Sequence, residues 1–364
     1  MPRWPEAFGA TPEDRVAILR IASMYNFTPR TLFELAERHG TAARCVEAIL
    51  DGEAGTASER DQLRTADPVE VARRAEAAGA RVVVPADAEY PASLEDLADP
   101  PAVLFVRGRS LTELYPRVAV IGSRRCTRGG EDMAKQIGAG LARAGVTVVS
   151  GGAIGIDGHS HRGALLADGP TLAVLGCGID VAYPPSHRTL LREIVEAGAL
   201  VSEYPPRVHA EPFRFPARNR IIAGLVEGLV VVEGAEGSGS LITTKHALEL
   251  GRDVFAVPGS VTSPLSEVPL AMLRDGARLI RGPDDLLADL GRLDPQTGAA
   301  APTELSERER AVLDALALQT LPERIAQELK WDLGDTLGAL VGLELRGLVR
   351  SVGGRFELRL ARRA

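Results

Sequence analysis

The feature that most constrains this fold is a series of short β-branched and aliphatic runs that alternate with helical stretches after residue 80. Nine such runs occur, at Arg81–Val84, Val103–Val106, Val118–Ile121, Val146–Val149, Leu172–Leu175, Leu200–Ser202, Leu229–Val232, Val254–Val257 and Arg278–Ile280. Apolar runs without polar alternation are typical of strands buried on both faces of a parallel sheet. Parallel strands are joined by right-handed, usually helical crossovers. We therefore expect an α/β domain at residues 79–290, an extended Rossmann-like, doubly wound and mostly parallel sheet.

Smaller domains are expected on both sides of this sheet. Residues 1–78 are expected to form a helical domain, with helices at Glu13–Tyr25, Pro29–His39 and Ala42–Leu50 and a further helix opening at Asp67-Pro68. A linker is expected at residues 291–304. Residues 305–364 show three helical patterns, at Glu307–Ala317, Pro322–Leu329 and Leu333–Leu348. Two short strands follow, at Leu348–Ser351 and Arg355–Leu358. This is the outline of a winged-helix domain.

The net charge of −7 does not exclude an anionic ligand, because local basic patches rather than the total charge control phosphate binding. Only three residues are lysines, so arginine carries nearly all the positive charge. Three widely separated cysteines are typical of a reducing compartment. No run of 18 apolar residues and no signal-peptide core is present. We therefore expect a cytoplasmic protein without a membrane anchor.

The loop after Val118–Ile121 is the first candidate for binding phosphate. Ligands of a doubly wound sheet bind beyond the carboxyl ends of its strands. This loop contains Gly122, Ser123, Arg124, Arg125 and Arg128 and leads into a helix. Glycine allows the backbone to approach a phosphate, the helix start offers free N–H groups, and guanidinium groups bind phosphate through two hydrogen bonds. Phosphate binding is therefore favoured over a plain strand-to-helix turn.

Three further segments are expected along the same sheet edge. The turn after Val146–Val149 contains Gly151 and Gly152, and the turn after Leu229–Val232 contains Ser238, Gly239 and Ser240. Between them, Phe215 and Arg218-Asn219-Arg220 form a segment interpreted as a loop before a helix at Ile221–Val226. Arginines interleaved with aromatic rings suit a single strand of nucleic acid. The repetition of such segments indicates a long anionic ligand.

Motifs for cofactors, metals and catalysis are missing. The turn after Val118–Ile121 lacks the GxGxxG pattern of a dinucleotide site, and no HExxH, GxSxG or P-loop motif is present, so no cofactor is expected. His159 and His161 are two residues apart and would point to different faces of a helix. Asp157 and His161 are four apart, and a hydrogen bond between them is favoured over a shared metal. No metal site and no enzymatic activity are predicted.

Several of these segments together resemble the DNA-processing protein A family (DprA, also called Smf). The resemblance covers about residues 80–285 and includes the stretches VAVIGSRRCT, VTVVSGGAIGID, TLAVLGCGIDVAYPPSH, FPARNRIIAGL and LVVVEGAEGSGSLITTKHALELGRDVFAVPG. The combination of GSR, FPxRNRIIAG and SGSLIT is highly specific. Two departures stand out: Ile154 replaces the usual arginine, and Val268-Pro269-Leu270 replaces a polar segment.

The resemblance implies a function that the spacing of residues does not. Members of the family bind and protect single-stranded DNA, load the RecA recombinase onto it during natural transformation, and form homodimers through the Rossmann-like domain. Many carry an N-terminal sterile-alpha-motif-like domain and a C-terminal winged helix. The predicted DNA-binding residues are Gly122, Ser123, Arg124, Arg125, Arg128, Gly151, Gly152, Asp157, His161, Phe215, Arg218, Asn219, Arg220, Ser238, Gly239, Ser240 and Lys245.

Two alternatives remain. A phosphoribohydrolase-like enzyme could use the same kind of pocket, with Glu233 or Asp157 as its acid. A transcription regulator could act through the winged helix, but the expected recognition helix Leu333–Leu348 contains only one cation, Arg346, and suits the major groove poorly.

Overall fold

The computed structural model describes residues 3–24, 27–291, 306–316, 319–345, 348–352 and 354–358. Its contacts divide the chain into two compact units, residues 1–293 and residues 294–364. Tyr25, Ala317, Arg346 and all of the predicted linker except Gly291 lie outside the described residues. In the described part of the chain, every helix is too short or too polar to cross a lipid bilayer.

The centre of the first unit is a nine-stranded sheet with the order β1-β2-β6-β5-β4-β3-β7-β8-β9. The strands are β1 (Arg81–Val83), β2 (Leu104–Gly108), β3 (Arg117–Ile121), β4 (Thr147–Ser150), β5 (Thr171–Leu175), β6 (Ala199–Ser202), β7 (Gly228–Val231), β8 (Asp253–Ala256) and β9 (Arg278–Leu279). Strand β2 runs antiparallel to β1 and β6, and all other pairs are parallel. The predicted mostly parallel sheet is confirmed.

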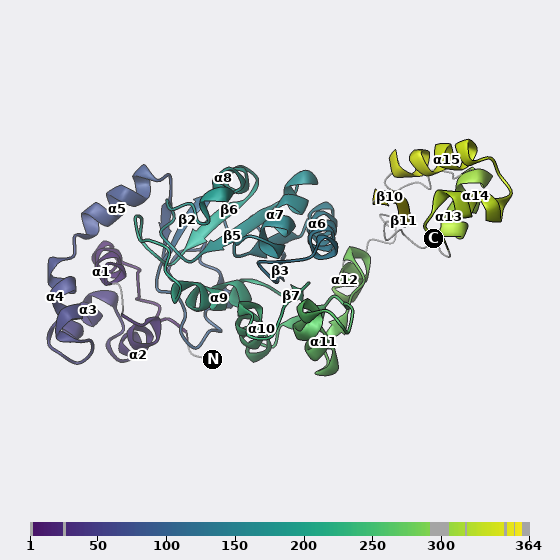
Figure 1. Cartoon of the computed structure of the whole chain (residues 1–364). Coiled ribbons are helices and arrows are strands. Elements are labelled where there is room, and N and C mark those ends of the chain that lie inside the picture. The colour runs from purple at the N-terminus through teal and green to yellow at the C-terminus, as the bar shows by residue number, and fades with distance from the viewer. Residues whose placement is uncertain are drawn as a thin grey trace. The chain divides into compact units, whose positions relative to one another are not determined.

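Helices cover both faces of the sheet (Figure 1). They are α6 (Arg128–Arg143), α7 (Ile156–Leu166), α8 (Arg188–Ala197), α9 (Arg214–Leu225), α10 (Gly239–Glu249), α11 (Glu267–Arg274) and α12 (Pro283–Asp289), with short 3₁₀ turns at Ala92–Leu94, Pro185–His187 and Pro264–Ser266. Successive residues of a strand point to opposite faces. Accordingly, Val118 and Val120 pack in the cluster that contains α6, whereas Ala119 and Ile121 pack in the cluster that contains α9.

The N-terminal helices share a core with the sheet. They are α1 (Pro12–Ala22), α2 (Pro29–His39), α3 (Ala42–Leu50), α4 (Ala57–Thr65) and α5 (Pro68–Ala77). Thr11 and Thr28 cap α1 and α2, as the Thr-Pro pairs predict. Apolar side chains of these helices belong to the same buried cluster as β2. A separate domain at residues 1–78 therefore stays a prediction.

The second unit is small and has its own core. It consists of α13 (Glu307–Leu316), α14 (Pro322–Leu329), α15 (Leu333–Leu345) and the antiparallel pair β10 (Val349–Val352) and β11 (Arg355–Leu358). Val312, Ile325, Leu340 and Phe356 are buried together. Three helices followed by a hairpin agree with the predicted winged helix.

Candidate nucleic-acid interface

The strand order places a crevice between β3 and β7. After β3 the chain builds β4, β5 and β6 on one side and then returns to add β7, β8 and β9 on the other side. Loops that follow two such strands diverge, which leaves a binding crevice at their carboxyl ends. A cleft of about 680 Å³ lies there, lined by the loops after β3 and β7, the start of α7, and α9. Most of the predicted site residues line this cleft: Gly122, Ser123, Arg124, Arg125, Asp157, Phe215, Arg218, Asn219, Ser238, Gly239 and Ser240.

The loop after β3 is held by Glu233. The backbone N–H of Ser123 donates to the Glu233 carbonyl at 2.7 Å, and the Thr127 N–H and hydroxyl donate to the Glu233 carboxylate at 2.8 and 2.5 Å. Thr127 also caps α6 through a 3.0 Å bond from the Gly130 N–H. This leaves Arg124 and Arg125 exposed on a fixed backbone. Both oxygens of Glu233 are occupied, which lowers its value as a catalytic acid.

Three flat side chains lie next to one another in the cleft wall. The Arg124 guanidinium lies 5.2 Å from the centre of the Phe215 ring, and the Tyr183 ring centre lies 5.2 Å from that of Phe215, with 31° between the planes. Tyr183 is 40% exposed. Phe215 is half-buried, so the exposed ring of Tyr183 and the open part of Phe215 beside the guanidinium offer bases a stacking surface. Tyr183 is not among the predicted site residues, although its position in the loop after β5, beyond a strand end, was a signal for it.

Asp157 and Arg218 form the floor of the cleft. Asp157 accepts hydrogen bonds from the N–H groups of Gly151 (3.1 Å) and Ala153 (3.4 Å), and burial raises its pKa. Arg218 is 4% exposed, and its Nη1 donates to the Gly151 carbonyl at 2.8 Å and to the Val174 carbonyl. Burial lowers the pKa of Arg218, and the nearby Asp157 opposes that effect. Arg218 therefore connects the ends of β4 and β5 through hydrogen bonds. Most of the accessible positive charge of the cleft then lies in the loop after β3.

Side-chain hydrogen bonds also hold the turn after β7. Ser238 caps α10 by accepting the Ser240 N–H at 3.3 Å and the Ser240 hydroxyl at 2.9 Å. Asn219 donates from Nδ2 to the Gly239 carbonyl at 3.3 Å. The amide of Asn219 therefore connects α9 to this turn across the cleft. Gly239 itself is exposed.

Comparison with known proteins agrees with this arrangement. Residues 81–291, which hold the sheet and the cleft, match the family model described as DNA recombination-mediator protein A. The chain belongs to that family. Residues 296–355 match the model described as DprA winged helix domain.

Individual relatives of this family cover most of the chain. A DNA processing protein DprA of Mycobacterium tuberculosis is 39% identical over 325 residues, 83% of this chain and 82% of the relative. Protein Smf of Escherichia coli is 44% identical over 210 residues, 57% of this chain and 56% of the relative. The crystal structure of DprA from Streptococcus pneumoniae superposes with a TM-score of 0.67 at 33% identity, covering 76% of this chain and 97% of that one. A Helicobacter pylori DprA structure, titled for its unique single-stranded DNA binding mode, gives 0.54 at 26% identity, covering 59% and 98%.

The segment Arg218-Asn219-Arg220 is helical, not a loop. Helix α9 begins at Arg214, so these residues lie in its second turn. Pro216 lies in the first turn of α9, where proline is tolerated. The helix turns Arg218 toward the cleft and Arg220 away from it.

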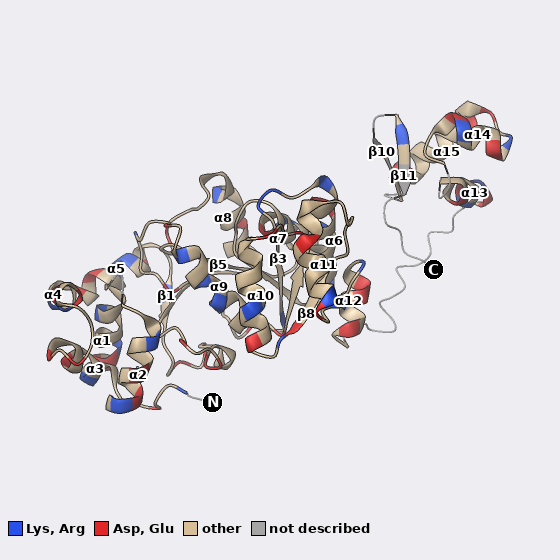
Figure 2. Ribbon diagram, turned by 60° about the horizontal axis from the view of Figure 1, so that its bottom comes forward, with Lys and Arg blue, Asp and Glu red and all other residues tan. Residues whose placement is uncertain are grey.

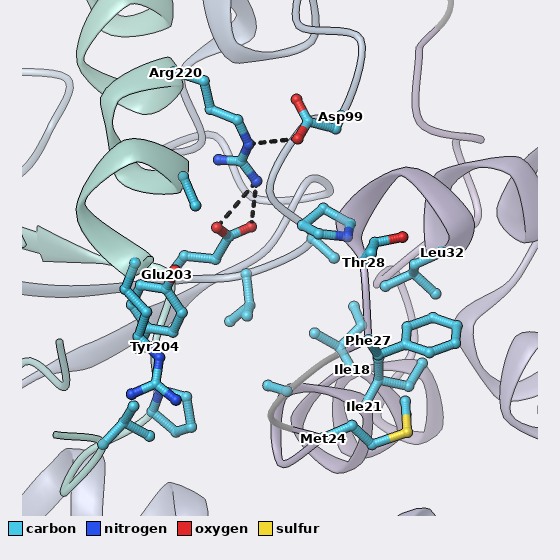
Figure 3. Close-up of a pocket in the computed structure, with 18 of the residues that line it drawn as sticks. Ile18, Ile21, Met24, Phe27, Thr28, Leu32, Asp99, Glu203, Tyr204 and Arg220 are labelled. Carbon is cyan, nitrogen blue, oxygen red and sulfur yellow. Dashed lines mark hydrogen bonds and ion pairs between the residues drawn. The ribbon is translucent and has the colours of Figure 1, made fainter. Parts of the chain in front are cut away.

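The structure gives Arg220 a structural role in place of the predicted DNA contact. Arg220 is 4% exposed, with Nε donating to Asp99 at 2.8 Å and Nη2 to Glu203 at 2.8 and 3.0 Å (Figure 3). It lines a second pocket of about 390 Å³ against α1 and α2, outside the cleft. Burial by itself would lower the pKa of Arg220, but the carboxylates of Glu203 and Asp99 raise it above the usual value.

The predicted hydrogen bond between Asp157 and His161 is not formed. The Thr171 hydroxyl donates to the Val148 carbonyl at 2.8 Å, so its oxygen accepts from Nδ1 of His161 at 2.7 Å. His161 is fully buried, and burial lowers its pKa to about 3. It is a neutral core residue and cannot contact DNA in the cleft.

The remaining predicted residues also lie outside the cleft lining. Gly151 and Gly152 lie behind it, where a Cβ on Gly151 would collide with the Arg218 guanidinium. Arg128 is exposed at the start of α6, and Lys245 is exposed on α10, 3.9 Å from Glu249. Ile154 is 44% exposed. Basic and acidic residues are interspersed over both units (Figure 2), so the cleft is marked by its shape and its exposed arginines rather than by overall charge.

Proposed function

We propose that this chain binds single-stranded DNA without processing it chemically, and that the strand lies in the cleft between β3 and β7. The observation that carries this proposal is the row of Arg124, Phe215 and Tyr183 beside a glycine loop with a second exposed arginine, Arg125. Guanidinium groups bind phosphate, and exposed rings stack on bases of any sequence. The Helicobacter pylori DprA structure, which is described by its single-stranded DNA binding mode, supports the assignment.

Membership of the family supports a wider role. We propose that the protein works in the cytoplasm, protects the bound strand, and loads a RecA recombinase onto it during natural transformation and recombination. We also propose that it acts as a homodimer formed through the Rossmann-like domain. The family description, DNA recombination-mediator protein A, supports the role in recombination.

The test is equilibrium binding of a labelled oligothymidylate to the full chain at low salt, with duplex DNA as competitor. We expect binding that duplex displaces poorly. Absence of affinity for the single strand would overturn the proposal. The same sample, incubated with nucleoside monophosphates, tests the phosphoribohydrolase alternative, because release of free base would favour it.

The contacts of the two candidate acids weaken that alternative. Glu233 is occupied by Thr127, and Asp157 by the N–H groups of Gly151 and Ala153. Among the described residues, neither carboxylate is hydrogen-bonded to a second acid or to a histidine. The regulator alternative would require duplex DNA to outcompete the single strand.

A further inference from the structure

Three metal-ligating side chains meet at the base of the loop that carries Arg124 and Arg125. Cys126 ends this loop, Glu131 lies in the first turn of α6, and His159 lies in the first turn of α7. One potential ligand atom from each lies within 4.8 Å of the other two. Nε2 of His159 and Oε1 of Glu131 are 3.5 Å apart. None of these three residues lines the cleft described above, although Arg124 and Arg125 of the same loop do.

One nitrogen of the His159 imidazole lacks a hydrogen-bond partner among the described residues. This is Nδ1, which is buried, whereas Nε2 lies 3.5 Å from Oε1 of Glu131. Buried polar groups in folded proteins are normally satisfied by protein, water or an ion. Nδ1 therefore lacks a partner on a ring whose Nε2 already faces the carboxylate of the cluster.

The framework behind the cluster is rigid. Helices α6 and α7 approach closely at two glycines: a Cβ on Gly138 would collide with the Ser160 carbonyl, and one on Gly163 with the Lys135 carbonyl. Such a contact fixes the distance between Glu131 and His159. Thr127, next to Cys126, is held by Glu233. The three ligands are therefore positioned before an ion arrives.

We propose that Cys126, Glu131 and His159 form a binding site for a zinc-type divalent transition metal. One thiolate, one imidazole and one carboxylate suit Zn²⁺, whereas Mg²⁺ and Ca²⁺ prefer oxygen ligands and iron–sulfur clusters need more thiolates. The thiolate and carboxylate would balance the charge of the ion. Three protein ligands leave a fourth position for water, and Glu131, with a 37% exposed side chain, leaves this side open to solvent.

The ion would connect the phosphate-binding loop to both helices. Cys126 directly follows Arg124 and Arg125 in the chain. A bond from its sulfur to an ion shared with α6 and α7 would restrict the movement of this loop. This consequence rests on the proposed function, but the site itself does not, because metal binding can be measured without DNA.

The experiment is a titration of the untagged full chain with Co²⁺, a spectroscopic substitute for zinc, followed by displacement with Zn²⁺. We expect one Co²⁺ per chain and a thiolate-to-cobalt charge-transfer absorption that Zn²⁺ removes. The variant Cys126→Ser should lose this absorption, and Glu131→Gln and His159→Gln should weaken Co²⁺ binding by at least about tenfold. His246→Gln is the matched control, because His246 lies 3.5 Å from Glu249 on α10 without a cysteine.

Two results would overturn the site. One is the absence of a charge-transfer absorption at saturating Co²⁺ in the wild type. The other is an absorption that persists in Cys126→Ser, which would assign it to Cys45 or Cys177. Circular dichroism of each variant confirms that a loss of binding is not a loss of fold. Binding of oligothymidylate by a chain that takes up no metal would leave the proposed function intact, so the two failures are distinguishable.

Discussion

The arginines of the loop after β3 and those of α9 are alike in sequence and differ in structure. Arg124 and Arg125 are exposed beside the cleft, whereas Arg218 and Arg220 are each 4% exposed. The buried pair has acceptors supplied by the protein: two carbonyls for Arg218 and two carboxylates for Arg220. Within the described part of the chain, the side chains of the exposed pair have no such acceptors, so they remain available to a ligand. Burial and existing partners, rather than residue type, therefore distinguish a structural arginine from an arginine that can bind a ligand.

Removal of Arg220 is the strongest test of this comparison. Arg220→Ala leaves Glu203, whose side chain is 15% exposed, and Asp99 without a partner. Breaking a buried ion pair by removing one partner costs about 3 kcal/mol or more. We expect a loss of that size in the free energy of unfolding measured in urea. Arg124→Ala is the control and should change it by less than about 0.5 kcal/mol. A stable Arg220→Ala variant with lost DNA affinity would break the comparison.

A pH titration extends the comparison to the buried His161. Burial lowers its pKa to about 3 in the folded state, whereas an unfolded histidine titrates near 6.5. Between these values the unfolded chain binds a proton that the folded chain does not, so stability falls as pH falls below 6.5. This residue alone should contribute about 2 kcal/mol of that loss between pH 6 and pH 4.5. His161→Gln should remove that share of the slope, and His246→Gln should not. Equal slopes in wild type and His161→Gln would show that His161 is not a neutral core residue.

The aromatic part of the cleft is tested by Phe215→Leu, which keeps an apolar side chain but removes the stacking face. Stacking of a base on an aromatic ring contributes about 1–3 kcal/mol. We expect oligothymidylate to bind about tenfold more weakly, with an unchanged salt dependence, because no phosphate contact is lost. A changed salt dependence with unchanged low-salt affinity would argue against base stacking on this ring.

Lys245 provides the smallest expected effect. It is exposed on α10 and lies outside the cleft lining. Lys245→Ala should change oligothymidylate affinity by less than about twofold and stability by less than about 0.5 kcal/mol. A tenfold loss of affinity in fluorescence anisotropy would instead extend the strand along the outer side of α10.

The strands could be predicted because each is marked locally by an apolar run. Each of the nine predicted runs coincides with one of β1 to β9 to within three residues at either end. Helix α4 was not predicted, because only Leu63 in it is buried and its sequence carries no apolar stripe. Helix α9 begins at Arg214, seven residues before the predicted start at Ile221, and Pro216 lies in its first turn.

The candidate site was predictable in outline but not residue by residue. Glycines and arginines after β3 identify the loop because they are local features. The burial of Arg220 depends on Asp99, which lies 121 residues away in sequence, and no local pattern reports such a contact. His161 shows the same limit, because it lies on α7 and its partner Thr171 lies on β5.

The most direct test of the account is the salt dependence of single-strand binding. Each phosphate contact to a single strand contributes about 0.7 to the slope of log affinity against log salt concentration. We therefore predict that Arg124→Ala/Arg125→Ala lowers the steepness of this slope by about 1.4 and weakens low-salt binding by at least about tenfold, with unfolding unchanged. The same slope and affinity as wild type in this double variant would contradict the account.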